Sequence, residues 1–172
     1  MLIDTHAHLD DARYESDRMA MIGRARAAGV EWMITIGCDL ATSRSAVTLA
    51  NQYPFVYASI GVHPHEVKHI EDGWYDEFRR LARDKKVVAY GEIGLDYHYD
   101  FSPRPSQRDV FAEQLRIAAS ARKPVLIHTR EAWEDTLALL EEHWTPTGLG
   151  GIMHCFSGGP DQAARVVAMG FH

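Results

Sequence analysis

Two histidines separated by one residue, His6 and His8, follow the apolar start of the chain. Side chains alternate between the two faces of a β-strand, so imidazoles at positions i and i+2 point the same way and can reach one cation. Alone, such a pair is a weak signal, because two polar residues can also simply end a strand. Its meaning depends on the other histidines and carboxylates of the chain.

Further imidazoles and one carboxylate follow short apolar runs later in the sequence: His63, Glu92, His128 and His154. If these runs are parallel strands of a barrel, their carboxyl ends surround one mouth, where such folds carry their active sites. A histidine that merely packs in a core has no reason to recur at that position. We therefore predict a metal centre whose ligands are His6, His8, Glu92, His128 and His154.

The ligand set indicates which ions the centre would hold. Imidazoles with a carboxylate suit zinc, manganese or a similar ion, and a carboxylate can bridge two of them. Glu92 is the natural bridge. In a two-metal site, with ions about 3.5–4 Å apart, one ion holds the attacking hydroxide and the other stabilises the leaving oxygen in displacement at phosphorus. We expect two divalent ions (Mg, Mn or Zn) as cofactors.

Other polar residues near the same strand ends are candidates for contacts with substrate. Arg130 could present its planar fork of donors to phosphate oxygens, or it could pair with a neighbouring glutamate. His63 and His65 flank a proline and could contact substrate or donate a proton, although a solvated loop position explains His65 as well. We predict Glu92 and His63 as catalytic residues, and Arg130 and His65 as substrate-binding residues.

Three aromatic residues after Asp96 could stack on a nucleobase beside the mouth, or could pack within a loop: Tyr97, Tyr99 and Phe101. The formal net charge of −6 argues against a broad electrostatic grip on duplex DNA. If the substrate is DNA, bound cations must supply the local positive charge. This balance favours a single strand or a strand end as substrate.

The elements that must position these residues can be read from the apolar runs, which predict six strands beginning near Leu2, Trp32, Phe55, Val87, Pro124 and Leu149. Helical periodicity between them predicts helices over residues 13–28, 42–53, 106–123 and 160–170, with a further helix capped by Asp72. Strand and helix alternation of this spacing predicts a parallel sheet in a TIM-type (β/α) barrel. An open doubly wound sheet would also fit, but no glycine-rich dinucleotide motif follows the first strand.

The length and composition are typical of one soluble globular domain, which we assign to residues 1–172. A closed eight-stranded barrel needs about 250 residues, so we expect about six of the eight βα units and a C-terminally truncated, incomplete barrel. The apolar runs are too short to span a bilayer, and no signal-peptide pattern precedes Asp4. We therefore expect a cytoplasmic protein without a membrane partner.

Five motifs resemble those of the TatD deoxyribonucleases, and they occur in the order and spacing of that family: LIDTHAHLD at 2–10, GVHPH at 61–65, GEIGLDY at 91–97, PVLIHTRE at 124–131 and HCFS at 154–157. The resemblance implies a TIM-type barrel of the metal-dependent amidohydrolase superfamily, two divalent ions and exonucleolytic hydrolysis of DNA.

The resemblance also implies residue roles. His6 and His8 would hold one ion, His128 and His154 the other, Glu92 would bridge them, and His63 would lie beside the substrate phosphate. A TatD protein continues through two further strands, and a Glu-Thr-Asp motif there supplies an aspartate to the first ion. That aspartate is absent from this sequence, which puts the activity of the chain as given in doubt.

A metal-dependent deoxyribonuclease acting on a single strand or 3′ end of DNA is thus the first functional hypothesis. Metal-activated water attacks carbonyl groups as readily as phosphorus. Hydrolysis of D-aminoacyl-tRNA, or of another ester or amide, at the same site is therefore the alternative. A catalytically inactive metal-binding fragment is the third.

Overall fold

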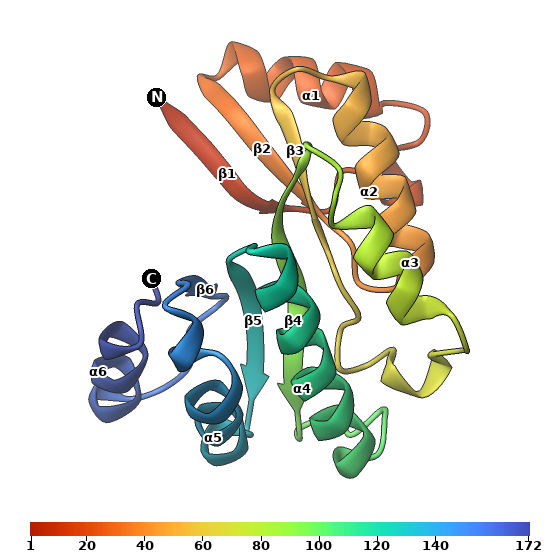
Figure 1. Ribbon diagram of the computed structural model, residues 1–172. Helices are drawn as coiled ribbons and strands as arrows, with labels where there is room; N and C mark the ends of the chain where they lie inside the picture. The colour runs from red at the N-terminus through yellow and green to blue at the C-terminus, as the bar shows by residue number, and fades with distance from the viewer.

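Strands and helices alternate along the computed structural model, which describes all residues from 1 to 172 (Figure 1). The strands are β1 (Leu2–Ala7), β2 (Val30–Ile36), β3 (Val56–Ile60), β4 (Val87–Asp96), β5 (Val125–Arg130) and β6 (Gly151–Met153). The helices are α1 (Arg18–Ala27), α2 (Leu40–Gln52), α3 (Trp74–Leu81), α4 (Arg104–Ala121), α5 (Trp133–His143) and α6 (Pro160–Ala168). Three short 3₁₀ turns complete the elements: η1 (Ala12–Tyr14), η2 (Val67–His69) and η3 (Thr145–Thr147).

The six strands form one sheet in which every neighbouring pair is parallel and the spatial order follows the chain, β1-β2-β3-β4-β5-β6. A doubly wound sheet reverses the direction in which strands are added, so this order excludes it. The sheet curls as successive strands are added (Figure 1). Six βα units of an incomplete TIM-type barrel, as predicted from the sequence, are confirmed.

Local sequence signals explain where several helices begin. The Asp39 side chain accepts a hydrogen bond from the backbone N–H of Thr42, and the backbone N–H of Asp39 donates to the Thr42 hydroxyl. This capping box starts α2 two residues before the predicted boundary. The helix predicted over 13–28 is instead divided into η1 and α1, because no residue of η1 is buried and Asp11 caps that turn separately. Gly73, with φ +85°, rather than Asp72, precedes α3.

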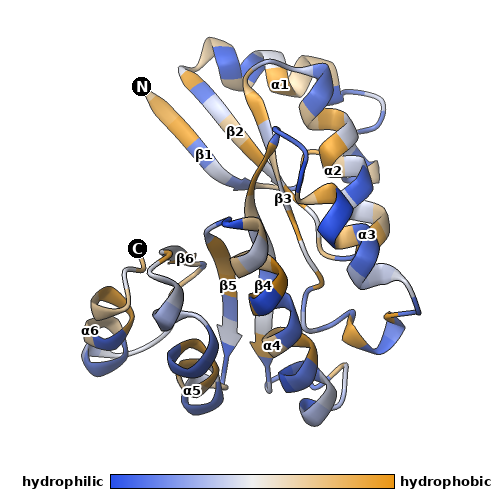
Figure 2. Cartoon of the chain, viewed as in Figure 1, coloured by the Kyte–Doolittle hydropathy of each residue, from blue (hydrophilic) through white to orange (hydrophobic).

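One continuous apolar core lies between the sheet and its helices, and it contains 35 buried residues. Apolar faces of α3 and α4 pack on this core: Phe78 in α3 and Phe111 and Leu115 in α4 are completely buried. Apolar segments follow the strands and one face of each of the longer helices, whereas the outer helix faces are polar (Figure 2). None of the helices combines the length and apolar character needed to cross a lipid bilayer.

Candidate metal centre

A bulge in β4 directs the Glu92 side chain. Tyr90 pairs with Val125 and Ile93 pairs with Ile127, so three steps along β4 match two along β5 and one extra residue is accommodated near Glu92. The sequence predicted Glu92 at a strand end. It lies inside β4 instead, because the strand continues past the bulge to Asp96. At that position Glu92 is only 5% exposed.

The Glu92 side chain lies close to residues from both outermost strands of the sheet. Its Oε2 is 3.5 Å from His6 Nε2, and the imidazoles of His6 and His154 stack with ring centroids 3.6 Å apart. The potential ligand atoms of these three residues all lie within 4.8 Å of one another. His6 is in β1 and His154 directly follows β6, so the curl of the sheet brings the two ends of the strand order together.

The other carboxylate oxygen faces a second group of imidazoles. Glu92 Oε1 is 3.2 Å from His128 Nδ1, and His128 lies with His63 and His65 in a second set whose ligand atoms are within 4.8 Å of one another. The His63 ring centroid is 4.5 Å from that of His128. A carboxylate with one oxygen towards each group has the arrangement that a bridging ligand requires.

The donor set fits a divalent cation. His6 Nδ1 is buried and has no hydrogen-bond partner, which is costly for a polar atom unless something else satisfies it. Burial lowers the pKa of His6 to about 4 and that of His63 to about 3, and both rings are therefore neutral at physiological pH. Neutral imidazoles are the form that binds metal.

The carboxylate is also in its metal-binding form. Burial alone would raise the pKa of Glu92, but the hydrogen bond to His128 and the neighbouring histidine charges outweigh it and lower the pKa to about 2. The ionised carboxylate, beside the neutral rings of His6 and His63, therefore supplies negative charge that attracts a cation.

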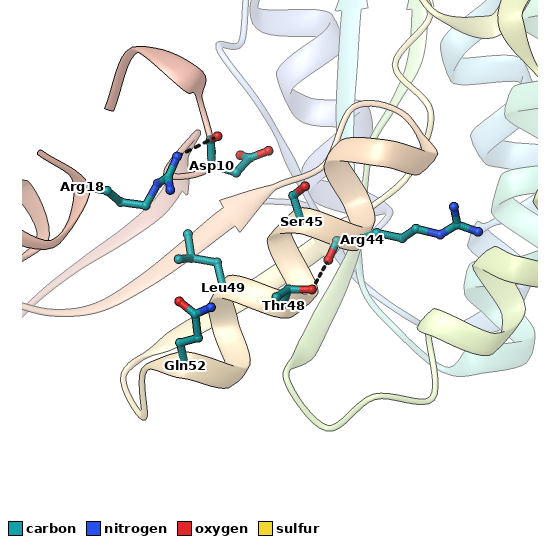
Figure 3. Close-up of a pocket in the computed structure, with 7 residues that line it drawn as sticks. All are labelled: Asp10, Arg18, Arg44, Ser45, Thr48, Leu49 and Gln52. Atoms are coloured by element: carbon teal, nitrogen blue, oxygen red, sulfur yellow. Dashed lines mark hydrogen bonds between the residues drawn. The ribbon is translucent and has the colours of Figure 1, made fainter. Parts of the chain in front are cut away.

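His8 lies at the margin of this centre. It follows the last residue of β1, is exposed, and its ring is 5.2 Å from that of His6, outside both groups of ligand atoms. The segment that carries it is held by Arg18, whose guanidinium donates to the carbonyl oxygens of Leu9, at 2.7 Å, and Asp10, at 3.1 Å. These contacts lie beside a pocket of about 380 Å³ next to α2, and no histidine lines this pocket (Figure 3).

Arg130 is the last residue of β5, is exposed and forms no ion pair, so the pairing with a neighbouring glutamate is absent. Its guanidinium lies over the Tyr99 ring, 4.7 Å from the centroid. Tyr99 stacks on Phe101 with an interplanar angle of 14°, and the two side chains are 47% and 52% exposed. Tyr97 differs, because its hydroxyl donates to Asp135 and its role there is packing.

Asp96 is a site residue that the sequence reasoning missed. Its carboxylate is buried at the end of β4, with Oδ2 2.8 Å from His65 Nε2 and 3.0 Å from His128 Nε2. The sequence does contain a signal for this residue, because Asp96 is an acidic residue at the end of a ten-residue, largely apolar strand. An acidic residue at that point needs a reason to be buried, and two imidazoles provide it.

Comparison with known proteins identifies relatives along the whole chain. The model of the family described as TatD related DNase matches residues 3–172. An uncharacterized metal-dependent hydrolase, YabD, of Bacillus subtilis is 40% identical over the full chain and 67% of its own length. A 3′-5′ ssDNA/RNA exonuclease TatD of Cronobacter turicensis is 37% identical over 99% of the chain and 65% of its own length.

Solved structures of other proteins have the same fold as this chain. The TatD homolog YJJV from Escherichia coli superimposes with a TM-score of 0.91 at 32% identity, covering 99% of this chain and 66% of that protein. An organophosphorus hydrolase from Deinococcus radiodurans, at 12% identity and a TM-score of 0.64, shares the fold. The chain thus spans about two thirds of the length of the relatives it matches.

Proposed function

This chain belongs to the family of TatD related DNases, and we propose that it acts as a divalent-metal-dependent exonuclease on single-stranded nucleic acid. The observation that carries the proposal is Glu92, whose two oxygens face two separate sets of imidazoles. A nuclease needs charge neutralisation on both sides of a phosphodiester, and a bridged pair of cations supplies it.

The chain's own residues divide into two ligand sets around this carboxylate. We propose that His6 and His8 contribute to one ion, that His128 and His154 contribute to the other, and that Glu92 bridges them. His154 also stacks on His6, and its ligand atom lies within 4.8 Å of those of His6 and Glu92. Bound ions of this class act as Lewis acids that activate water at neutral pH.

His63 is suited to contact the phosphate. Its Nδ1 accepts a hydrogen bond from the backbone N–H of His65, 3.2 Å away, so in the neutral ring the proton is on Nε2. That N–H can donate to a phosphate oxygen beside the metal centre. We propose this role for His63, with His65 and Arg130 as further contacts to the substrate.

The aromatic pair beside Arg130 favours nucleic acid over a small ester or amide. Stacked, exposed rings next to a guanidinium without an acidic partner are a typical platform for single-stranded bases and phosphates. Phe101 is 4.8 Å from His65 by ring centroids, so the platform adjoins the imidazole cluster. The net charge of −6 makes long duplex DNA the poorer substrate.

The first prediction concerns substrate class. With manganese, magnesium or zinc added, a single-stranded DNA labelled at its 5′ end should be shortened stepwise, and chelation should stop the reaction reversibly. A D-aminoacyl-tRNA serves as the competing substrate in parallel. Hydrolysis of that ester by metal-loaded protein that leaves DNA intact would refute the nuclease proposal.

The second prediction concerns the stacked pair of Tyr99 and Phe101. Tyr99→Ala should raise KM for single-stranded DNA roughly 5- to 150-fold, because stacking of one base is worth about 1–3 kcal/mol. Initial rates over a range of oligonucleotide concentrations measure this change. Tyr14→Ala, which removes an exposed tyrosine from η1, is the matched control and should leave KM unchanged. An unchanged KM for Tyr99→Ala would show that bases do not stack there.

A further inference from the structure

The buried carboxylate of Asp96 has a partner for each oxygen. Oδ1 accepts hydrogen bonds from the backbone N–H groups of His98, at 3.1 Å, and Tyr99, at 2.9 Å. Oδ2 lies within hydrogen-bond distance of His65 Nε2 and His128 Nε2. Gln107, also buried, holds the Asp96 backbone by donating to its carbonyl oxygen and accepting from its N–H. The carboxylate therefore has little freedom to turn.

This fixed carboxylate gives the two ring nitrogens of His128 different roles. An ionised carboxylate only accepts, so the nitrogen that faces Asp96, Nε2, must carry a proton. Nδ1 forms a hydrogen bond with Glu92 Oε1, 3.2 Å away, so it is the nitrogen that can exchange its proton for a metal ion. A cation bound at this place would replace the proton that joins Nδ1 to Glu92, and would be held by both atoms.

We propose that Asp96 is a positioning residue of the metal centre: by binding His128 at Nε2 it directs the Nδ1 lone pair towards Glu92 and the cation. The inference rests on the proposed metal centre but not on the identity of the substrate. It also ties the metal ligand to the segment after β4, because the same carboxylate orders His98 and Tyr99. Hydrogen bonds of this kind fix the orientation of metal-bound imidazoles in proteins.

Asp96→Asn should move the ring proton of His128 from Nε2 to Nδ1. The backbone N–H groups of His98 and Tyr99 require an oxygen at the Oδ1 position, so the new amide NH₂ must face the imidazoles. It would donate to His128 Nε2 and force the ring proton to Nδ1, where the lone pair is needed. Titration of the metal-free protein with zinc or manganese should then show affinity weaker by roughly 10- to 100-fold.

Asp100→Asn is the matched control. Asp100 lies four residues further along, is exposed and pairs only with Arg104. The substitution makes the same change of charge in the same segment, so its metal affinity should equal that of the parent. Equal weakening in both variants would mean that general charge, rather than the contact with His128, sets the affinity, and would overturn the proposal.

Long-range ¹H–¹⁵N spectra of the zinc-loaded parent protein provide a readout that needs neither a variant nor a substrate. The expected result is a protonated Nε2 and a zinc-bound Nδ1 on His128. The opposite assignment would reject the proposal even if Asp96→Asn failed to fold. If the spectrum and affinities are as expected while DNA is not hydrolysed, the proposed function fails and the role of Asp96 stands.

Discussion

Replacing Glu92 by glutamine is expected to reduce hydrolysis of single-stranded DNA by about 10³-fold or more and to lower the number of bound ions. The amide has no charge and only one oxygen, whereas the carboxylate faces His6 with one oxygen and His128 with the other. Loss of a single electrostatic donor at a transition state costs about 10²–10³-fold, and a bridging ligand serves two ions. Single-turnover kinetics and elemental analysis of the same sample measure both effects.

Glu66→Gln is the control for this experiment. Glu66 also neighbours the histidine-rich segment after β3, but its carboxylate contacts only His69, at 3.9 Å, and is 41% exposed. Its substitution should change neither the rate nor the ion count. Full activity of Glu92→Gln with two bound ions would show that Glu92 is not the bridge.

Replacing Gly94 by alanine is expected to lower the free energy of unfolding by about 3 kcal/mol or more, combining backbone strain with a core clash. Gly94 has φ +142°, which L side chains rarely adopt. Its new methyl group would collide with the carbonyl oxygen of His128, the residue it pairs with in β5. Relief of the clash must displace His128, so metal affinity should fall as well.

Urea unfolding of the metal-free protein isolates the stability effect from the loss of metal. Gly23→Ala in α1 is the matched control, because no atom lies within 4 Å of the added carbon and its backbone is helical. That change should stabilise the protein by about 0.5–1 kcal/mol. Similar stability of both variants would contradict the close approach of β4 and β5 described above.

Much of the fold could be predicted from the sequence, because buried parallel strands leave apolar runs that need no tertiary information. Each predicted strand start lies within two residues of the observed one. Helix starts were less predictable at 13–28, where a charged stretch continues the helical pattern but η1 is exposed. The start of such a helix is decided by a capping residue and by which side chains are buried, rather than by periodicity.

For the candidate site, the residues that gather were easier to predict than the way they are arranged. Strand ends pointed to His6, His128 and His154, and these side chains do gather around Glu92. Two features depend on pairing between strands, which residue types do not reveal. The bulge that turns Glu92 inward is a matter of register, and the contacts of Asp96 join residues more than 30 positions apart.

The stacking of His6 on His154 has a thermodynamic consequence for the whole chain. These residues are roughly 150 positions apart and belong to the two outermost strands of the sheet. In the proposed centre Glu92 bridges an ion held by His6 and an ion held by His154, which would link the beginning of the sheet to its end, and cross-links that close long loops remove the most freedom from the unfolded chain. Metal binding and cooperative folding would therefore be linked equilibria, and β1 and β6 would gain the most stability.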